Sequence, residues 1–208
     1  MFTAYPVDAD HAYEYQEGPF VPAGPEVAVH LEPGDDAAVG RAAAGELTGV
    51  ALIELTTYNI AAPVSGDDYG ELLRVLSPVA AGFGLIVQVP FAALHESARK
   101  VLERLGGHLI EAMDTQAWPG SQIVGRTTVE RFLFRLDSDS LEVLVSSASS
   151  LYDWVNPRLP EDSHFLRSDG SVVLGTVAQE DDAWLQLTPA EYERIAARIP
   201  RGVVLRPA

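Results

Sequence analysis

Cysteine is absent from the 208 residues of this chain. Its absence excludes disulfide bonds, thiol nucleophiles and metal sites built from cysteine. Long apolar stretches are also missing, since no run approaches the ~18 residues that a membrane-spanning helix needs. The first residues lack the basic segment followed by an apolar segment that marks a secretory signal. We therefore expect a cytoplasmic protein that does not enter a membrane.

Positive charge is scarce in this chain. Thirty aspartates and glutamates face 14 lysines and arginines, of which only Lys100 is a lysine, and the net charge is −16. This balance disfavours nucleic-acid binding, because affinity for nucleic acids depends on basic side chains that neutralise phosphates. It also disfavours anionic membrane surfaces. The remaining interpretations are a basic protein partner, or acidity that serves solubility alone.

The composition is otherwise that of a globular protein, with 47% hydrophobic and 21% charged residues. The length suits a single domain. We predict one α+β domain over residues 1–208, with a mixed or largely antiparallel sheet and four to five helices. Residues 1–40 contain eight acids and no base. We interpret them as an acidic extended arm, with a strand at 27–31 and a turn at 33–36.

The clearest pattern lies at 159–200, where three short apolar runs are separated by turn residues. Asp169-Gly170 separates the first two runs, and Asp-Gly in this position is a strong hairpin signal. A polar turn at 179–182 separates the second from the third. The pattern predicts a three-stranded antiparallel meander. Thr188-Pro189-Ala190-Glu191 then has the form of a helical capping box, which predicts a helix that ends at Pro200.

The rest of the chain predicts alternating strands and helices. Apolar runs indicate strands at 49–55 (continued by or paired with 56–62), 85–89, 109–113 and 128–136. Helical spacing indicates helices from Asp67 or Asp68 to Val79 (stopped by Gly82 and Gly84), from Pro90 to Leu105, and from Leu141 to Trp154. We interpret 114–125 as a loop.

The C-terminal segment also carries a recurring signature. Pro160-Glu161-Asp162 is followed by Phe165-Leu-Arg167-Ser-Asp169-Gly170, and an acidic turn precedes Ala183-Trp184-Leu185. This segment resembles uncharacterised small bacterial proteins that share such a C-terminal signature, over about 35 residues. Many of those proteins carry His-Glu at the acidic turn, where this chain has Gln179-Glu180. The resemblance implies no activity.

Two short motifs resemble metal sites. His95-Glu96-Ser97-Ala98-Arg99 begins like the helical zinc-protease motif, but Arg99 stands where that motif needs a second histidine. A surface helix with a Glu96–Arg99 pair is the favoured interpretation. Asp137-Ser138-Asp139 is similar to the aspartate-x-aspartate motif by which many glycosyltransferases hold a divalent metal. The same residues also stand where a helix needs an N-cap, and we favour capping.

No other motif points to chemistry. The phosphate-binding loop and the nucleophile elbow are absent, and the five histidines have no ligand spacing. The sequence therefore identifies no catalytic, cofactor-binding or metal-ligating residue, and it predicts no cofactor.

Acidic clusters beside aromatic residues are the remaining candidates for a functional surface. The predicted partner-binding residues are Trp154, Glu161, Asp162, Glu180, Asp181, Asp182 and Trp184. They suggest a non-enzymatic acidic binding protein, of the immunity or inhibitor type, that occludes a basic partner protein. The alternative is an enzyme or small-ligand binder whose site assembles from distant residues, in one version through a divalent metal at Asp137 and Asp139. A third hypothesis is a self-associating structural protein. The sequence does not determine the oligomeric state.

Overall fold

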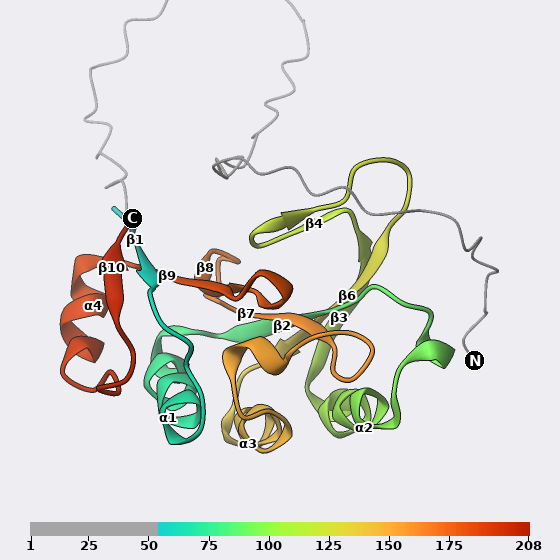
Figure 1. Cartoon of the computed structure of the whole chain (residues 1–208), viewed down its shortest axis with the longest axis horizontal. Coiled ribbons are helices and arrows are strands. Elements are labelled where there is room, and N and C mark those ends of the chain that lie inside the picture. The colour runs from blue at the N-terminus through green and yellow to red at the C-terminus, as the bar shows by residue number, and fades with distance from the viewer. Residues whose placement is uncertain (1–53) are drawn as a thin grey trace, which may run out of the picture. The chain divides into compact units, whose positions relative to one another are not determined.

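The computed structural model describes residues 54–208 and shows one eight-stranded antiparallel sheet with helices (Figure 1), which confirms the α+β prediction. The strand order is β10-β1-β9-β8-β7-β2-β6-β3. The strands of this sheet are β1 (Thr56–Ile60), β2 (Gly82–Val87), β3 (Leu109–Thr115), β6 (Val129–Arg135), β7 (Glu161–Leu166), β8 (Val172–Val177), β9 (Asp182–Leu187) and β10 (Leu205–Pro207).

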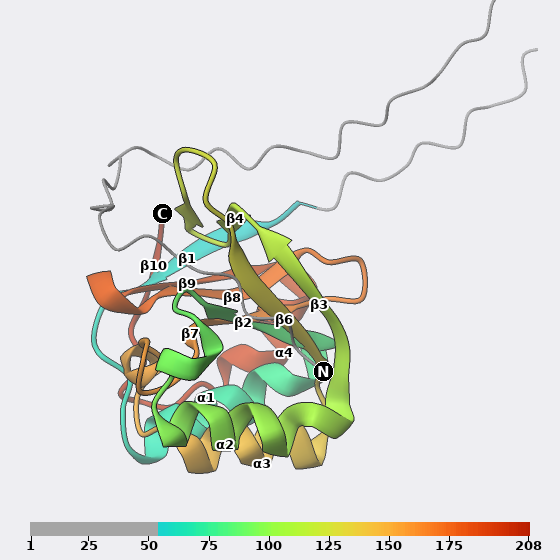
Figure 2. The same cartoon turned by 90° about the vertical axis from the view of Figure 1, so that its right-hand side faces the viewer.

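Three helices lie on one face of this sheet, and a small hairpin lies on the other (Figures 1 and 2). The three helices are α1 (Asp67–Leu76), α2 (Glu96–Leu105) and α3 (Ser138–Ser147), and α4 (Pro189–Ala196) follows β9. The hairpin consists of β4 (Ala117–Trp118) and β5 (Ser121–Gln122). Short 3-10 helices are η1 (Ser77–Val79), η2 (Phe91–Ala93), η3 (Gly106–His108), η4 (Leu151–Asp153) and η5 (Ala178–Glu180). None of the helices in residues 54–208 combines the length and the apolar composition of a membrane-spanning segment.

The main core lies between the sheet and the helices. Strand β2 illustrates why, since Phe83, Leu85 and Val87 belong to this core while Ile86 points to the other face. This alternation is the period-two pattern of a strand. On the hairpin face, Ile86 packs with Trp118 and Val129 in a second, smaller cluster. The sheet therefore carries helices on one face and a hairpin-covered patch on the other.

The C-terminal meander is confirmed as antiparallel β7-β8-β9, followed by α4. Thr188 Oγ1 accepts a hydrogen bond from the Glu191 amide at 3.1 Å, and Glu191 Oε2 accepts one from the Thr188 amide at 2.8 Å. This is the predicted capping box, with Pro189 in the first turn. Gly170 has φ 83°, the left-handed backbone that the Asp-Gly turn requires.

Several predicted boundaries are wrong. Helix α1 begins at Asp67, within the predicted start, but its N-cap is Gly66 rather than an aspartate, and it ends at Leu76, where η1 follows. Gly82 and Gly84 lie inside β2 rather than ending the preceding helix. Gly84 is needed there because a Cβ atom at this position would collide with the His164 ring. The first described strand begins at Thr56, after two exposed residues.

Three further segments differ from the predictions. Pro90 precedes η2 rather than α2, which starts after His95; the Nδ1 atom of His95 accepts from the Ser97 amide at 3.3 Å. The segment 114–125 continues β3 and holds the β4-β5 hairpin, so it is more than a loop. Helix α3 ends at Ser147 and is followed by η4 rather than continuing to Trp154. The predicted arm, strand and turn within 1–40 and the start of the strand at 49–53 lie outside the described residues.

Candidate functional site

The structure brings the seven predicted partner-binding residues into one region, but it divides them by exposure. Glu180, Asp181 and Asp182 are exposed at the turn between β8 and β9, and Trp184 is half-buried. Three of the seven predictions are wrong as surface contacts: Trp154, Glu161 and Asp162 are buried. Glu161 and Asp162 are buried because β7 is an interior strand, paired with β2 on one side and β8 on the other.

A β-bulge in β7 directs Asp162 toward the hairpin. Gly84 of β2 pairs with His164, whereas Ile86 pairs with Glu161, so β7 contains one extra residue at this point. Asp162 has φ 50°, a left-handed backbone that aspartate tolerates better than most residues. Bulges re-aim side chains, and here the result is a carboxylate under the β4-β5 hairpin.

The Asp162 carboxylate joins two segments that are distant in sequence. Its Oδ2 atom accepts a hydrogen bond from Trp118 Nε1 at 2.7 Å, and its Oδ1 atom accepts one from the Ala178 amide at 2.8 Å. Burial raises the pKa of Asp162 to about 6, and the two hydrogen bonds oppose this shift. Asp162 therefore holds both the hairpin and the start of η5 in place.

Glu161 supports the same turn from its other side. Its carboxylate accepts hydrogen bonds from Asn156 Nδ2 at 2.8 Å and from Gln179 Nε2. Burial raises the pKa of Glu161 above its usual range, and the hydrogen bonds from neighbouring amides oppose the shift. Because Gln179 immediately precedes Glu180, the buried pair Glu161–Asp162 fixes the base of the exposed acidic turn.

His164 is fully buried next to this pair. Its Nδ1 lies 2.8 Å from the backbone oxygen of Asp162, and since a carbonyl oxygen only accepts, Nδ1 carries the hydrogen. Its Nε2 atom has no hydrogen-bond partner among the described residues. Burial lowers the pKa of His164 to about 3, and the charge of Arg131 adds to the effect. The imidazole is therefore neutral at pH 7.

Trp184 links the hairpin to the sheet. A Cβ atom at either Gly175 or Gly120 would collide with its indole ring. The ring thus lies between β8 and the hairpin turn, where Gly120 has φ 81°. This close packing explains why Trp184 is only half-exposed, although it follows an exposed acidic turn.

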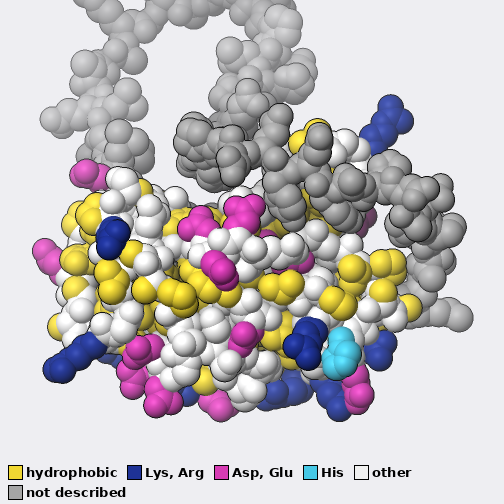
Figure 3. Space-filling view, in the orientation of Figure 1, with side chains coloured by type: hydrophobic (Ala, Val, Ile, Leu, Met, Phe, Trp, Pro, Cys, Tyr) yellow, Lys and Arg dark blue, Asp and Glu magenta, His cyan; other side chains and the backbone are white. Residues whose placement is uncertain are grey.

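The exposed part of the site is the acidic turn, which we define as Glu180, Asp181 and Asp182. The backbone of Asp181 adopts the left-handed conformation, with φ 53°. No ion pair formed within residues 54–208 includes any of these three acids. Burial raises the pKa of the nearby Tyr152, and the negative charges of Asp182 and Asp181 add to this shift. Figure 3 shows acidic side chains in the middle of the visible face and also along its lower rim, where basic side chains lie among them.

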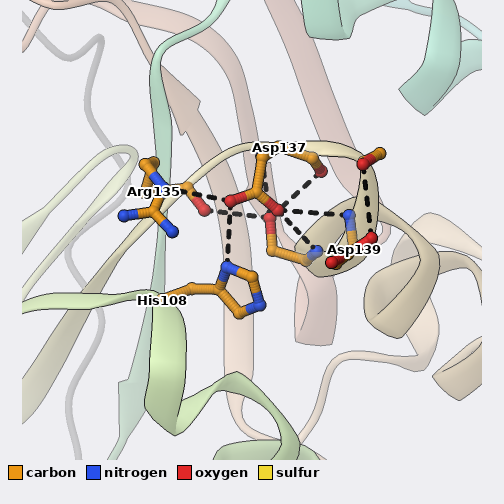
Figure 4. Close-up of polar contacts among 6 residues, drawn as sticks. His108, Arg135, Asp137 and Asp139 are labelled. Atoms are coloured by element: carbon orange, nitrogen blue, oxygen red, sulfur yellow. Dashed lines mark hydrogen bonds and ion pairs between the residues drawn. The ribbon is translucent and has the colours of Figure 1, made fainter.

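The capping interpretation of Asp137 is supported by its contacts (Figure 4). Its Oδ1 atom accepts from the amides of Asp139 and Ser140 at 3.1 and 3.0 Å, and its Oδ2 atom lies 3.0 Å from both Arg135 Nε and His108 Nδ1. These contacts, led by the Ser140 amide, hold the pKa of Asp137 well below its usual range. The Oδ1 atom of Asp137 therefore caps α3, and its Oδ2 atom links the start of this helix to Arg135 of β6 and His108 of η3.

His95 and Glu96 also take structural positions. His95 is the N-cap of α2, and Glu96 pairs with Lys100 at 2.6 Å rather than with the predicted Arg99. Within residues 54–208, no group of three or more histidines, aspartates and glutamates is arranged to hold a metal ion.

Several residues of this site were not predicted, among them Trp118, Arg131 and His164. Trp118-Pro119-Gly120 is a turn signal that could have indicated the hairpin. No local signal shows that the hairpin folds onto Asp162, because that contact spans 44 positions.

Comparison of the chain with protein families, with curated proteins and with solved structures finds no match. The function is therefore inferred from the residues and their arrangement.

Proposed function

We propose that this chain is a binding protein whose acidic turn docks on a basic surface of a partner protein. The observation that supports this most directly is the turn itself. Three consecutive acids are exposed there without an ion pair formed inside the described part of the chain. Unpaired exposed acids attract basic partners and speed their association.

The rigidity of the turn also supports docking. Its base is held by the buried carboxylates of Glu161 and Asp162, and its far end leads into β9. A site that is ordered before binding loses less conformational freedom on association. Half-buried Tyr152 and Trp184 flank the acids and supply aromatic area of the kind found at binding hot spots.

The finer proposal is an inhibitor or immunity protein. In that role the acidic turn would occupy the basic surface with which the partner binds its own polyanionic substrate. A cytoplasmic location is part of the same proposal and rests on the sequence alone.

The test is a charge reversal with a matched control. The turn variant carries Glu180→Arg, Asp181→Arg and Asp182→Arg. The control variant carries Glu71→Arg, Glu103→Arg and Glu193→Arg, which are exposed acids on three different helices. Both variants change the net charge equally. The wild type and both variants are immobilised, exposed to a native cell extract and eluted with rising salt, and eluted proteins are identified by mass spectrometry.

We expect the wild type and the control to retain the same basic protein, and the turn variant to retain at least tenfold less of it. Retention should weaken with salt, because exposed charges are screened. Equal retention by the two variants would show that the acidic turn is not the binding site.

One observation favours a second function, the binding of a small polar molecule. Within residues 54–208, three buried polar atoms have no partner: Arg131 Nε, Asn156 Oδ1 and His164 Nε2. All three belong to residues bordering β2, since Arg131 pairs with Ile86, Asn156 donates to the Ile86 carbonyl and His164 pairs with Gly84. A buried polar atom without a partner costs about 1–3 kcal/mol, which a bound molecule could offset.

A thermal-shift screen of small carboxylates and polyols tests this second function. A ligand at this site should raise the melting temperature of the wild type and leave that of His164→Asn unchanged. If no compound acts, and a crystal structure shows ordered water at Nε2, the site is structural.

A further inference from the structure

Strand β3 is an open edge of the large sheet. Within the described chain it pairs with β6 alone, and its outer side has no neighbouring strand. Six of its seven residues are exposed, among them Leu109 at 45%, Ile110 at 65% and Met113 at 40% of the accessible surface. The strand contains neither lysine nor proline, which commonly protect such edges. Its backbone groups are therefore available for pairing with another strand.

The charged side chains of β3 itself, Glu111 and Asp114, are both negative. Asp114 of β3 stands opposite Glu130 of β6, on the same face of the sheet. Burial raises the pKa of Glu130, and the negative charge of Asp114 adds to this shift. Glu111 lies on the other face, as does Met113, which stands opposite Arg131. No ion pair formed within residues 54–208 includes Glu111, Asp114 or Glu130.

These charges decide between two occupants of the edge. A second copy of β3 would bring a second set of the same acids to the same edge, and like charges on adjacent strands repel. A strand with basic side chains would instead neutralise Asp114 and Glu130. Its alternate, apolar side chains would lie on the opposite face, beside Met113 and Glu111.

We propose that the outer edge of β3 accepts a β-strand of a partner protein in which arginine or lysine alternates with apolar residues. The backbone of the added strand pairs with residues 109–115, as in other cases of strand addition. This proposal shares with the proposed function the basic character of the partner, and it uses a different surface from the acidic turn.

The probe is a synthetic peptide that alternates valine with arginine over the length of β3. Its affinity for the full chain is measured by fluorescence anisotropy, and exchange of the amide hydrogens of residues 109–115 is followed by mass spectrometry. Two control peptides are used: one alternates valine with glutamate, and one keeps the sequence but has every amide N-methylated. The protein variants are Asp114→Asn with Glu130→Gln, and the turn variant defined above.

We expect the Val-Arg peptide to bind and to slow amide exchange in β3. The N-methylated peptide should bind at least tenfold more weakly, because it cannot form backbone hydrogen bonds. The Asp114→Asn, Glu130→Gln variant should also lose at least tenfold in affinity, whereas the turn variant should bind almost normally.

Two outcomes would overturn the proposal. Equal binding of the N-methylated peptide would show that charge alone attracts the probe. Loss of binding in the turn variant, with β3 exchange unchanged, would place the peptide on the acidic turn, so the β3 proposal would fail while the proposed function stood. The opposite combination is also informative. If the Val-Arg peptide binds β3 normally, while the turn variant and its control retain the basic protein equally, the proposed function fails and the β3 proposal stands.

Discussion

At the scale of single residues, burial shifts the pKa values of Asp162 and His164 in opposite directions, because it disfavours the charged form of each group. The pKa of Asp162 is raised to about 6, from an ordinary value of ~4. Between pH ~4 and 6, Asp162 is therefore protonated in the folded state and ionised in the unfolded state. The stability that it contributes is fully present below ~4 and is lost as the pH rises through 6. The pKa of His164 is lowered to about 3, from ~6.5. Stability from His164 is present above ~6.5 and is lost as the pH falls toward 3.

We predict opposite pH profiles for two substitutions at these sites. Between pH 6 and 4 the two contributions oppose each other in the wild type. The stability contributed by His164 decreases as the pH falls, and His164→Asn removes this contribution. The variant should therefore lose less free energy of unfolding than the wild type when the pH falls from 7 to 4. Asp162→Asn should lose more. Each difference should approach about 1.4 kcal/mol per pH unit at most. The measurement is urea unfolding at several pH values.

Asp181→Asn is the matched control for Asp162→Asn. Both aspartates have a left-handed backbone, with φ 53° and 50°. Asp181 is exposed and Asp162 is buried. The Asp181→Asn profile should therefore follow the wild type. If all three variants follow the wild type, the buried pair does not control stability at acidic pH.

At the scale of elements, Arg167 fastens the β7-β8 turn to β9 and α4. Its Nε and Nη2 atoms contact the two carboxylate oxygens of Glu191 at 2.9 and 2.7 Å. Its Nη1 and Nη2 atoms also donate to the carbonyl oxygens of Val172 and Gln186, both at 2.6 Å. Arg167 lowers the pKa of Glu191 to about 2. The arginine of the C-terminal signature is thus a structural connection between three elements.

Replacing Arg167 should destabilise the fold even when the charge is kept. Arg167→Ala should lower the free energy of unfolding by about 2–4 kcal/mol, because the side chains of Arg167 and Glu191 are only 14% and 15% exposed. Arg167→Lys should recover little, since an ammonium group cannot make the two-pronged contact. Urea unfolding at pH 7 measures both variants. Arg194→Ala, an exposed change on α4, should cost less than ~0.5 kcal/mol. Full stability of Arg167→Lys would contradict this account.

At the scale of the whole molecule, half of the net charge lies outside the described residues, since 1–53 contain nine acids and one base. Within 54–208 the exposed acids are spread over helices and strands, and they gather most clearly at the acidic turn. Other acids act locally. Those at the edge of β3, for example, protect this edge from pairing with a second copy of the chain. Charges on an edge strand discourage pairing between copies of a chain.

Removal of the edge charges should therefore promote self-association. Glu111→Gln, Asp114→Asn and Glu130→Gln together should give a concentration-dependent increase in mass, measured by light scattering after size-exclusion chromatography. The control is Glu71→Gln, Glu103→Gln and Glu193→Gln, which makes the same change in net charge on helices. If both triple variants associate equally, the effect comes from net charge rather than from β3.

Local signals in the sequence determined the C-terminal meander and α4. The Asp169-Gly170 turn, the apolar runs around it and the capping box at Thr188 each depend on residues only a few positions apart. Turn chemistry and helix capping act over that range, so the meander and α4 could be predicted. The strand at Leu109 and the role of Asp137 as a cap follow from similar local patterns.

Only the tertiary structure decided which acids face solvent. Glu161 and Glu180 belong to the same acidic segment, yet one is buried between β2 and β8 and the other is exposed. The difference arises from a bulge opposite Gly84 and from a hairpin that folds onto Asp162. Burial depends on contacts between residues distant in sequence, and no local pattern records them.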